Sequence, residues 1–253
     1  IWNPDDRTFS VKHRYVDDDP TGTPSDVYTV QFTVTDDDGG SDSSALDTTV
    51  NNVAPHTVTI DGAPTSVPEG QEVSLTSTVI DASPNDTFTY LWTVTASNGQ
   101  IIADGIGPDF SFTPNDNASA GPNPATYTVN LKVTDDDGGV AHAESNVISV
   151  IDVPPTVPLT GAESIDENQW YSLTIGPITD PGDNDVASIS LIRIDWNGDG
   201  IYDQTLESGQ LEELRDGNTV QLDHFYNDGP AGISKITVLV LNGDNTFTYN
   251  KPF

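Results

Sequence analysis

The stretch Phe32-Thr-Val-Thr-Asp-Asp-Asp-Gly-Gly40 decides the fold, because it returns 99 residues later as Leu131-Lys-Val-Thr-Asp-Asp-Asp-Gly-Gly139. A degraded third copy is Val238-Leu-Val-Leu-Asn-Gly-Asp-Asn245. A period of about 100 residues is too long for a solenoid unit and fits a whole β-sandwich domain. The sequence therefore predicts sandwich domains in tandem.

Proline-containing junctions follow the two intact copies and set the expected boundaries. They are Asn51-Asn-Val-Ala-Pro55 and Ile151-Asp-Val-Pro-Pro155. We expect residues 1–54 to be the C-terminal part of one domain, 55–153 a complete domain, and 154–253 a third domain truncated in its last strand. Such a layout indicates an excerpt from a longer protein.

Strands are indicated almost throughout by alternation of apolar and polar residues, which buries one face of a strand and leaves the other wet. The clearest alternating series lie in the following ranges, each of which begins and ends on an apolar residue: 28–34, 73–79, 88–94, 127–133, 171–175 and 192–196. Clusters of Gly, Pro, Asn and Asp mark the turns between them. Only Leu206–Arg215 is expected to form a short helix, so the fold class is all-β, with antiparallel immunoglobulin-like sandwiches.

The charge balance restricts the partners. With 40 acidic and 8 basic side chains the formal net charge is −32, which excludes nucleic acid and anionic membranes as partners. Cysteine is absent, so a bound metal is the staple open to a small domain of this kind. We find no stretch long enough for a membrane-spanning helix, and expect no membrane insertion of this segment.

Several of these motifs resemble the PKD-type immunoglobulin-like repeats of secreted prokaryotic proteins. The resemblance lies in the strand and hairpin at 28–40 and 127–139, in Trp92, in Ile194-Asp-Trp-Asn-Gly-Asp-Gly200, and in His13-x-Tyr15 and His224-x-Tyr226. It implies an extracellular or cell-surface spacer, adhesive stalk or accessory module of a secreted hydrolase. The 55–153 domain lacks the Gly-Asp-Gly turn and the 154–253 domain lacks the Asp-Asp-Asp-Gly-Gly hairpin.

The sharpest single motif predicts a calcium loop. Its oxygen ligands alternate along the chain, and the sixth position is glycine, so that a loop can wrap around one hard cation. The predicted ligands are Asp195, Asn197, Asp199, the Ile201 carbonyl and Asp203. The alternative is a hairpin turn that uses Asn, Asp and Gly for their turn propensity.

Other acidic clusters are weaker calcium candidates, since solvated turns explain them equally well. In the 55–153 domain we expect Glu69, at the entrance past the Pro55 junction, to join Asp81, Asp86, Asp135, Asp136 and Asp137. The matching set in the 154–253 domain is Glu167, Asp180, Asp183 and Asp185, and Asp36, Asp37 and Asp38 form a third candidate. A cation shared near a junction would immobilise the linker. Asp17, Asp18 and Asp19 are expected to be a solvated loop.

Catalysis finds little support, because no nucleophile motif, zinc-protease pattern or phosphate loop is present. Trp92 and Trp196 occupy core-strand positions and are expected to pack inside. Trp2, Trp170 and Tyr171 are candidates for stacking on sugar rings.

The leading hypothesis is a non-catalytic, calcium-rigidified structural or adhesive segment of a larger extracellular protein, as a stalk, filament or surface layer. Its partners would be other repeats of the same protein, which could complete each other's sheets in a fibre, and a surface glycan or protein target. The alternative is a carbohydrate-binding or spacer module of a secreted polysaccharide-degrading or proteolytic enzyme.

Overall fold

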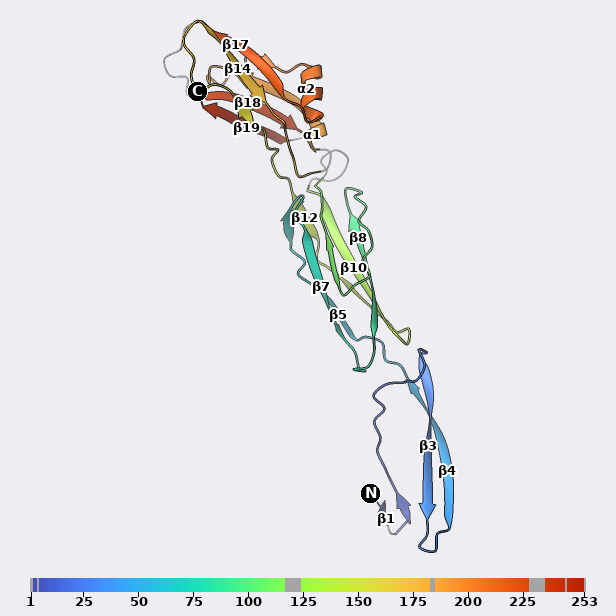
Figure 1. The fold of residues 1–253 in the computed structure, drawn as a ribbon. Coiled ribbons are helices and arrows are strands. Elements are labelled where there is room, and N and C mark those ends of the chain that lie inside the picture. The colour runs from blue at the N-terminus through green and yellow to red at the C-terminus, as the bar shows by residue number, and fades with distance from the viewer. Residues whose placement is uncertain are drawn as a thin grey trace.

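The structure, a computed structural model, describes residues 2–3, 5–116, 124–182, 185–227, 235–243 and 245–252, with the side chains of residues 2 and 3 excepted. Three bodies follow one another end to end in an elongated molecule (Figure 1). We keep the predicted ranges 1–54, 55–153 and 154–253 as the names of the first, second and third domain. Two of these domains have a buried hydrophobic core, and the first does not.

The second domain is a sandwich of two sheets. One sheet has the order β5-β7-β9, and in the other β10 pairs with β8, β11 and β12, while β12 pairs in parallel with β6. The strands are β5 (Thr57–Asp61), β6 (Ser66–Pro68), β7 (Val73–Ile80), β8 (Phe88–Ala96), β9 (Asp109–Phe112), β10 (Thr126–Asp135), β11 (Val140–Glu144) and β12 (Ile148–Ile151). Trp92, Val129 and Val133 are fully buried between the sheets, as the alternation predicts.

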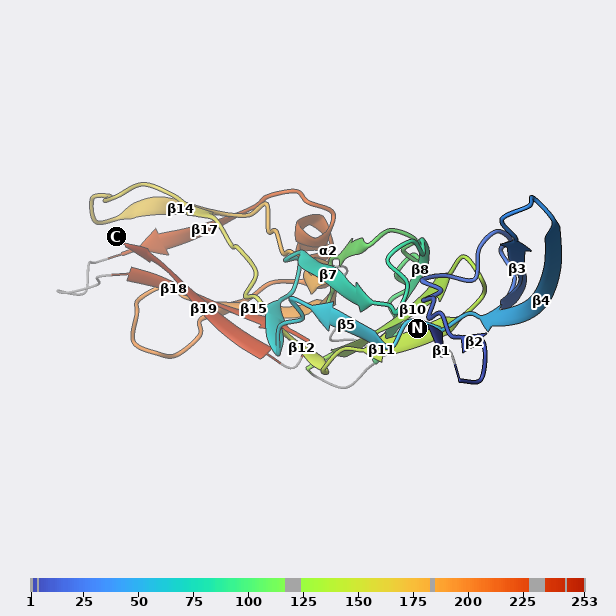
Figure 2. The ribbon, with the colours of Figure 1, turned by 90° about the horizontal axis from the view of Figure 1, so that it is seen from below.

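The third domain repeats the sandwich and adds two short helices. Its sheets have the orders β13-β14-β17 and β16-β15-β18-β19, and Figure 2 shows them as two layers. The elements are β13 (Leu159–Thr160), β14 (Gln169–Ile175), α1 (Asp185–Ser188), β15 (Ile189–Asp195), β16 (Gln204–Thr205), α2 (Ser208–Arg215), β17 (Val220–Tyr226), β18 (Lys235–Asn242) and β19 (Asn245–Pro252). Trp196 is buried in the core and packs flat on His224, with ring centroids 4.9 Å apart.

The predicted helix near Leu206 is confirmed as α2, which begins two residues later because Glu207 forms its cap. The Glu207 amide donates to Gln210 Oε1 at 3.0 Å, and the Glu207 side chain accepts in return from the backbone of residue 210, a capping box. Leu211 and Leu214 bury the inner face of the helix. The four-residue α1 was not predicted from the sequence.

The first domain is an open half of such a sandwich. It consists of β1 (Trp2–Asn3), β2 (Thr8–Phe9) and the long hairpin of β3 (Ser25–Thr35) and β4 (Ser41–Asn51). Val30, Phe32 and Val34 of β3 are 48%, 40% and 53% exposed. Their counterparts in β10, 99 residues later, are buried. The expectation of one buried face is therefore wrong for the described part of this domain. Phe9 of β2 packs on Phe32 and Tyr15 packs on Tyr28, but these contacts leave the face about half exposed.

Both Asp-Asp-Asp-Gly-Gly segments form the same tight hairpin. The first aspartate accepts the amide of the second glycine at 2.6 Å in each, through Asp36 Oδ1 from Gly40 and Asp135 Oδ1 from Gly139. Gly39 and Gly138 both have φ of 89°, a left-handed conformation that favours glycine. The sequence repeat is thus a structural repeat down to single hydrogen bonds.

Candidate cation sites at the domain junctions

Carboxylates gather at the two places where one domain meets the next. Among the described residues, five sets of three acidic side chains have ligand oxygens within 4.8 Å of one another. Three sets lie where the first domain meets the second: Asp17, Asp18 and Asp137; Asp81, Asp86 and Asp135; and Asp86, Asp136 and Asp137. Two lie where the second meets the third: Glu69, Asp180 and Asp185; and Glu69, Asp116 and Asp152.

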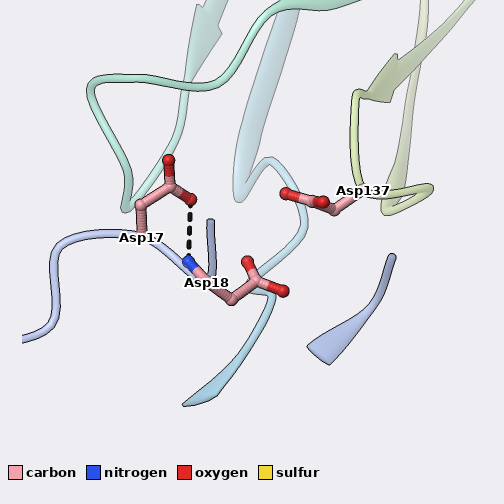
Figure 3. Close-up of side chains that lie close together, drawn as sticks. All are labelled: Asp17, Asp18 and Asp137. Atoms are coloured by element: carbon pink, nitrogen blue, oxygen red, sulfur yellow. Dashed lines mark hydrogen bonds between the residues drawn. The ribbon is translucent and has the colours of Figure 1, made fainter. Parts of the chain in front are cut away.

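At the first junction, carboxylates from two domains face each other (Figure 3). Asp18 lies between β2 and β3 of the first domain and is 2% exposed, and Asp137 of the β10–β11 hairpin is 7% exposed. The Asp18 amide donates to Asp17 Oδ1 at 2.9 Å, so this oxygen of Asp17 already has a hydrogen-bond partner. Asp18 Oδ2 is buried and accepts no hydrogen bond.

The other two sets of this junction link the β10–β11 hairpin to the loop after β7. Asp136 Oδ1 accepts the Thr87 amide at 2.9 Å, and Asp135 Oδ2 accepts from Asn52 Nδ2 in the linker at 3.0 Å. Asp81 Oδ2 and Asp86 Oδ2 are buried without a partner. A cavity of about 140 Å³ lies beside this site and is lined by Asp17, Asp18 and Asn52, among others.

At the second junction, Glu69 occupies the centre. It follows β6, its amide donates to the Ile151 carbonyl at 3.0 Å, and its Oε1 accepts the Val153 amide of the linker at 2.8 Å. Glu69 Oε2 is buried and unpartnered, as are Asp116 Oδ1, Asp180 Oδ2 and Asp185 Oδ2. Glu69, Asp116 and Asp185 are 2%, 3% and 3% exposed.

Burial and mutual repulsion disfavour the ionised form of these groups. Burial is the largest cause that raises the pKa of Glu69, to about 9, with further contributions from Asp116 and Asp185. Burial raises the pKa of Asp137 to about 6, aided by the charge of Asp18, and raises that of Asp185 to about 6, aided by Asp116. In the part of the chain that the structure describes, no lysine or arginine forms an ion pair with them, so these carboxylates lack a positively charged partner there.

The structure corrects the expected position of Glu69. We expect it from the sequence beside Asp135–Asp137 at the first junction, but β5 carries the chain to the opposite end of the second domain before Glu69 is reached. Asp17 and Asp18 were expected to be solvated, yet Asp18 is buried at the first junction. Both errors arise because sequence distance from a junction does not show at which end of a sandwich a loop lies.

The matching set in the third domain is divided. Asp180 and Asp185 lie at the second junction, whereas Glu167 is exposed before β14 and belongs to none of the described carboxylate sets. Asp183 lies outside the described residues. Sequence reasoning missed Asp116 and Asp152. The signal that could have found Asp116 is its position 99 residues after Asp17, the same offset that relates Asp180 to Asp81 and Asp185 to Asp86.

In the 195–203 loop, the predicted ligands accept backbone hydrogen bonds. Asp195 accepts the amides of Gly198 at 2.7 Å and Gly200 at 2.9 Å, and Asp203 Oδ2 accepts the Trp196 amide at 2.8 Å. Asn197 Oδ1 accepts the Asp199 amide at 3.0 Å, and Asp199 Oδ1 accepts the amide of Ile201 at 2.7 Å. These bonds are what a self-contained turn requires. A calcium ion in this loop stays a prediction.

The remaining candidates are dispersed. Asp36, Asp37 and Asp38 are exposed at the hairpin end of the first domain, away from the first junction (Figure 1). Tyr171 is 1% exposed, so stacking of this ring on a sugar is ruled out by burial. Trp170 is 66% exposed and packs on Phe225, with ring centroids 5.2 Å apart. The side chain of Trp2 lies outside the described part.

The architecture is that of immunoglobulin-like β-sandwiches in tandem, and one comparison finds a family model that resembles part of the chain. Residues 51–148 match the family model of the bacterial Ig domain. This match covers the second domain almost entirely and supports a structural or adhesive repeat module. A comparison with curated proteins gives no match.

Solved structures show distant likenesses. The N-terminal eight Ig domains of Down Syndrome Cell Adhesion Molecule isoform 1.30.30 are 15% identical, over 91% of this chain and 31% of that chain, with a TM-score of 0.33. The FN1–FN3 domains of chicken CNTN1 are 13% identical over 89% and 78% (TM-score 0.26), and Parabacteroides merdae β-glucuronidase is 9% identical over 80% and 24% (TM-score 0.26). This chain spans about a third of the first of these proteins. With TM-scores this low, the three likenesses carry no argument about function.

The described helices are α1 and α2, and neither has the length and apolar character needed to cross a membrane.

Proposed function

We propose that this chain is a non-catalytic, calcium-stiffened segment of a prokaryotic extracellular or cell-surface protein, in which PKD-type immunoglobulin-like domains act as a stalk or adhesive spacer. The observation that supports it best is the set of buried carboxylate oxygens without partners that neighbouring domains contribute to both junctions. Such groups are costly when ionised and unpaired. Calcium prefers carboxylate oxygens and accepts six to eight ligands in flexible geometry.

The residues at the junctions explain how the segment would stiffen. Without a cation, burial and mutual repulsion oppose ionisation of Asp18 and Asp137 at the first junction and of Glu69 and Asp185 at the second, which raises the pKa of all four groups. Calcium supplies the positive charge that neutralises them. The carboxylates of both domains are then held around common ligand positions, and the angle between the domains becomes fixed.

The test is small-angle X-ray scattering of the purified chain in millimolar calcium and in excess EDTA. We expect a larger radius of gyration and a longer maximum dimension in calcium, because the three bodies stay in line, and a more compact, flexible ensemble in EDTA. Magnesium should have less effect, since it demands octahedral geometry and retains its water ligands. The double variant Asp18→Asn/Asp137→Asn should lose part of the calcium response.

The matched control is Asp37→Asn/Asp38→Asn, which removes the same charges from an exposed hairpin outside the described carboxylate sets and should leave the response unchanged. Identical scattering of the wild-type chain in calcium and EDTA would remove the stiffening mechanism. The alternative, polysaccharide binding through the exposed Trp170, would then come first, and loss of affinity for an insoluble glucan or chitin in Trp170→Ala would test it.

Partners are expected from within the same protein. The face of β3 that carries Val30, Phe32 and Val34 is about half exposed, although Phe9 packs on Phe32 and Tyr15 packs on Tyr28. Strands from elsewhere in the same protein, or from a neighbouring repeat, could pack on the remainder of this face. This arrangement would join neighbouring repeats into a fibre.

A further inference from the structure

Glu69 belongs to two carboxylate sets at once. With Asp180 and Asp185 it forms a set that crosses from the second domain to the third. With Asp116 and Asp152 it forms a set confined to the second domain and its linker. Each carboxylate oxygen has two lone pairs, so Glu69 can bind one cation through Oε2 and a second through the lone pair of Oε1 that the Val153 amide leaves free.

The cluster has free ligand atoms on both sides of Glu69. On one side, Asp116 Oδ1 is buried without a hydrogen-bond partner. On the other side, Asp180 Oδ2 and Asp185 Oδ2 are also buried without partners. The second oxygens are oriented by the protein: Asp180 Oδ1 accepts the Gly182 amide at 3.0 Å, and Asp152 Oδ2 accepts from Asn245 Nδ2 at 2.7 Å. Each carboxylate is thus anchored through one oxygen or held by burial.

Gly182 shows how closely the backbone approaches this cluster. A Cβ atom at this position would overlap with Glu69 Oε2 and Asp185 Oδ2. A side chain is therefore excluded from the space that these oxygens face. Nearby, Gly70 of the second domain has φ of 69°, and a Cβ there would lie 2.7 Å from Pro181 Cβ of the third. The two domains meet closely around Glu69.

The charge of the cluster decides the number of cations. Its five carboxylates, when ionised, carry five negative charges with no basic partner among the described residues. One divalent cation would leave three uncompensated charges in a largely buried site, and two would leave one. Because uncompensated buried charge is strongly destabilising, two cations fit this cluster better than one.

We propose that the second junction is a two-cation centre in which Glu69 bridges two calcium ions. One ion is held with Asp116 and Asp152 and fixes the linker to the second domain. The other is held with Asp180 and Asp185 and fixes the third domain to the second. This inference rests on the proposed function and adds how many ions bind and which part of the junction each one fixes.

The experiment counts calcium ions per chain by native mass spectrometry and calorimetric titration, at the free calcium concentration that just saturates the wild-type chain. Glu69→Gln is expected to bind two fewer ions than the wild type. Asp116→Asn and Asp180→Asn should each bind one fewer, and the double variant two fewer. Glu167→Gln is the matched control, because Glu167 follows Glu69 by 98 residues, is exposed and should change nothing.

Stability provides a readout that separates metal loss from misfolding. Glutamine at position 69 keeps an oxygen for the Val153 amide and removes a buried carboxyl whose Oε2 has no hydrogen-bond partner. We therefore expect the melting temperature of Glu69→Gln to equal or exceed that of the wild type in EDTA, and to fall below it in calcium. A melting temperature below that of the wild type in both conditions would indicate a structural role for Glu69. The number of bound calcium ions would then be judged from the Asp116 and Asp180 variants.

Two results would overturn the two-cation centre while leaving the proposed function intact. One is a loss of a single ion in the double variant Asp116→Asn/Asp180→Asn. The other is a loss of one ion or none in a stably folded Glu69→Gln. Absence of calcium binding by the wild-type chain would be a different outcome and would overturn the proposed function itself.

Discussion

Replacing Leu131 by alanine is expected to lower the free energy of unfolding of the second domain by about 2–5 kcal/mol, the usual cost of such a truncation in a packed core. Leu131 is 1% exposed between the two sheets. The same change at its repeat counterpart, Phe32→Ala, is expected to cost less than about 0.5 kcal/mol, as at exposed sites generally. Phe32 is 40% exposed, and its ring contacts that of Phe9 at the domain surface.

Urea unfolding followed by circular dichroism checks this pair, because the strands of the first and second domains both contribute to the signal, and fluorescence of the buried Trp92 follows the second domain separately. The two variants should be compared at low and high protein concentration. An equal cost of Phe32→Ala and Leu131→Ala would show that the β3 face is covered in solution. Sedimentation would then reveal association in the wild type that Phe32→Ala reduces, which is the result expected if repeats complete each other's sheets.

Calcium is expected to raise the thermal midpoint of the chain well above its value in EDTA. A ligand that binds only the native state adds about 2.7 kcal/mol at a hundred times its dissociation constant. Several junction ions would add more, because each binds a cluster that is unfavourable without it. The melt is measured by circular dichroism in millimolar calcium, in millimolar magnesium and in excess EDTA.

The control for this melt is Asp18→Asn combined with Glu69→Gln, which weakens both junctions and should reduce the calcium shift. Equal midpoints for the wild-type chain in calcium and EDTA would mean that the acidic surplus is solvated surface.

Local patterns were sufficient to predict the strands, the helix and the buried tryptophans. Alternation along Tyr127, Val129 and Leu131 depends only on the twofold period of a strand, so it could be recognised without any tertiary knowledge. The alternation around Phe32 is just as regular, yet its face is exposed. Whether a face is buried depends on the partner sheet, and no local pattern contains that information.

The candidate sites show the same limit more sharply. The 195–203 loop has contiguous ligand spacing and is easily found, but its oxygens are occupied by backbone amides. The clusters with unpartnered oxygens are assembled from segments as far apart as Glu69 and Asp185. Most of the aspartates and glutamates in these clusters could be picked out from the sequence as candidate ligands. Which of them lie together depends on which loops share an end of a sandwich, and the sequence does not show that.

The two junctions share three positions of successive repeats: Asp17 and Asp116 on one side, and Asp81 with Asp86 and Asp180 with Asp185 on the other. A contact between neighbouring domains that recurs at equivalent positions does not depend on how many domains the protein contains. A gene could gain or lose whole repeats by recombination, and the domains brought together would still present matching carboxylates. The reach of the molecule from its anchor could therefore change in steps of one domain, without any new interface having to evolve.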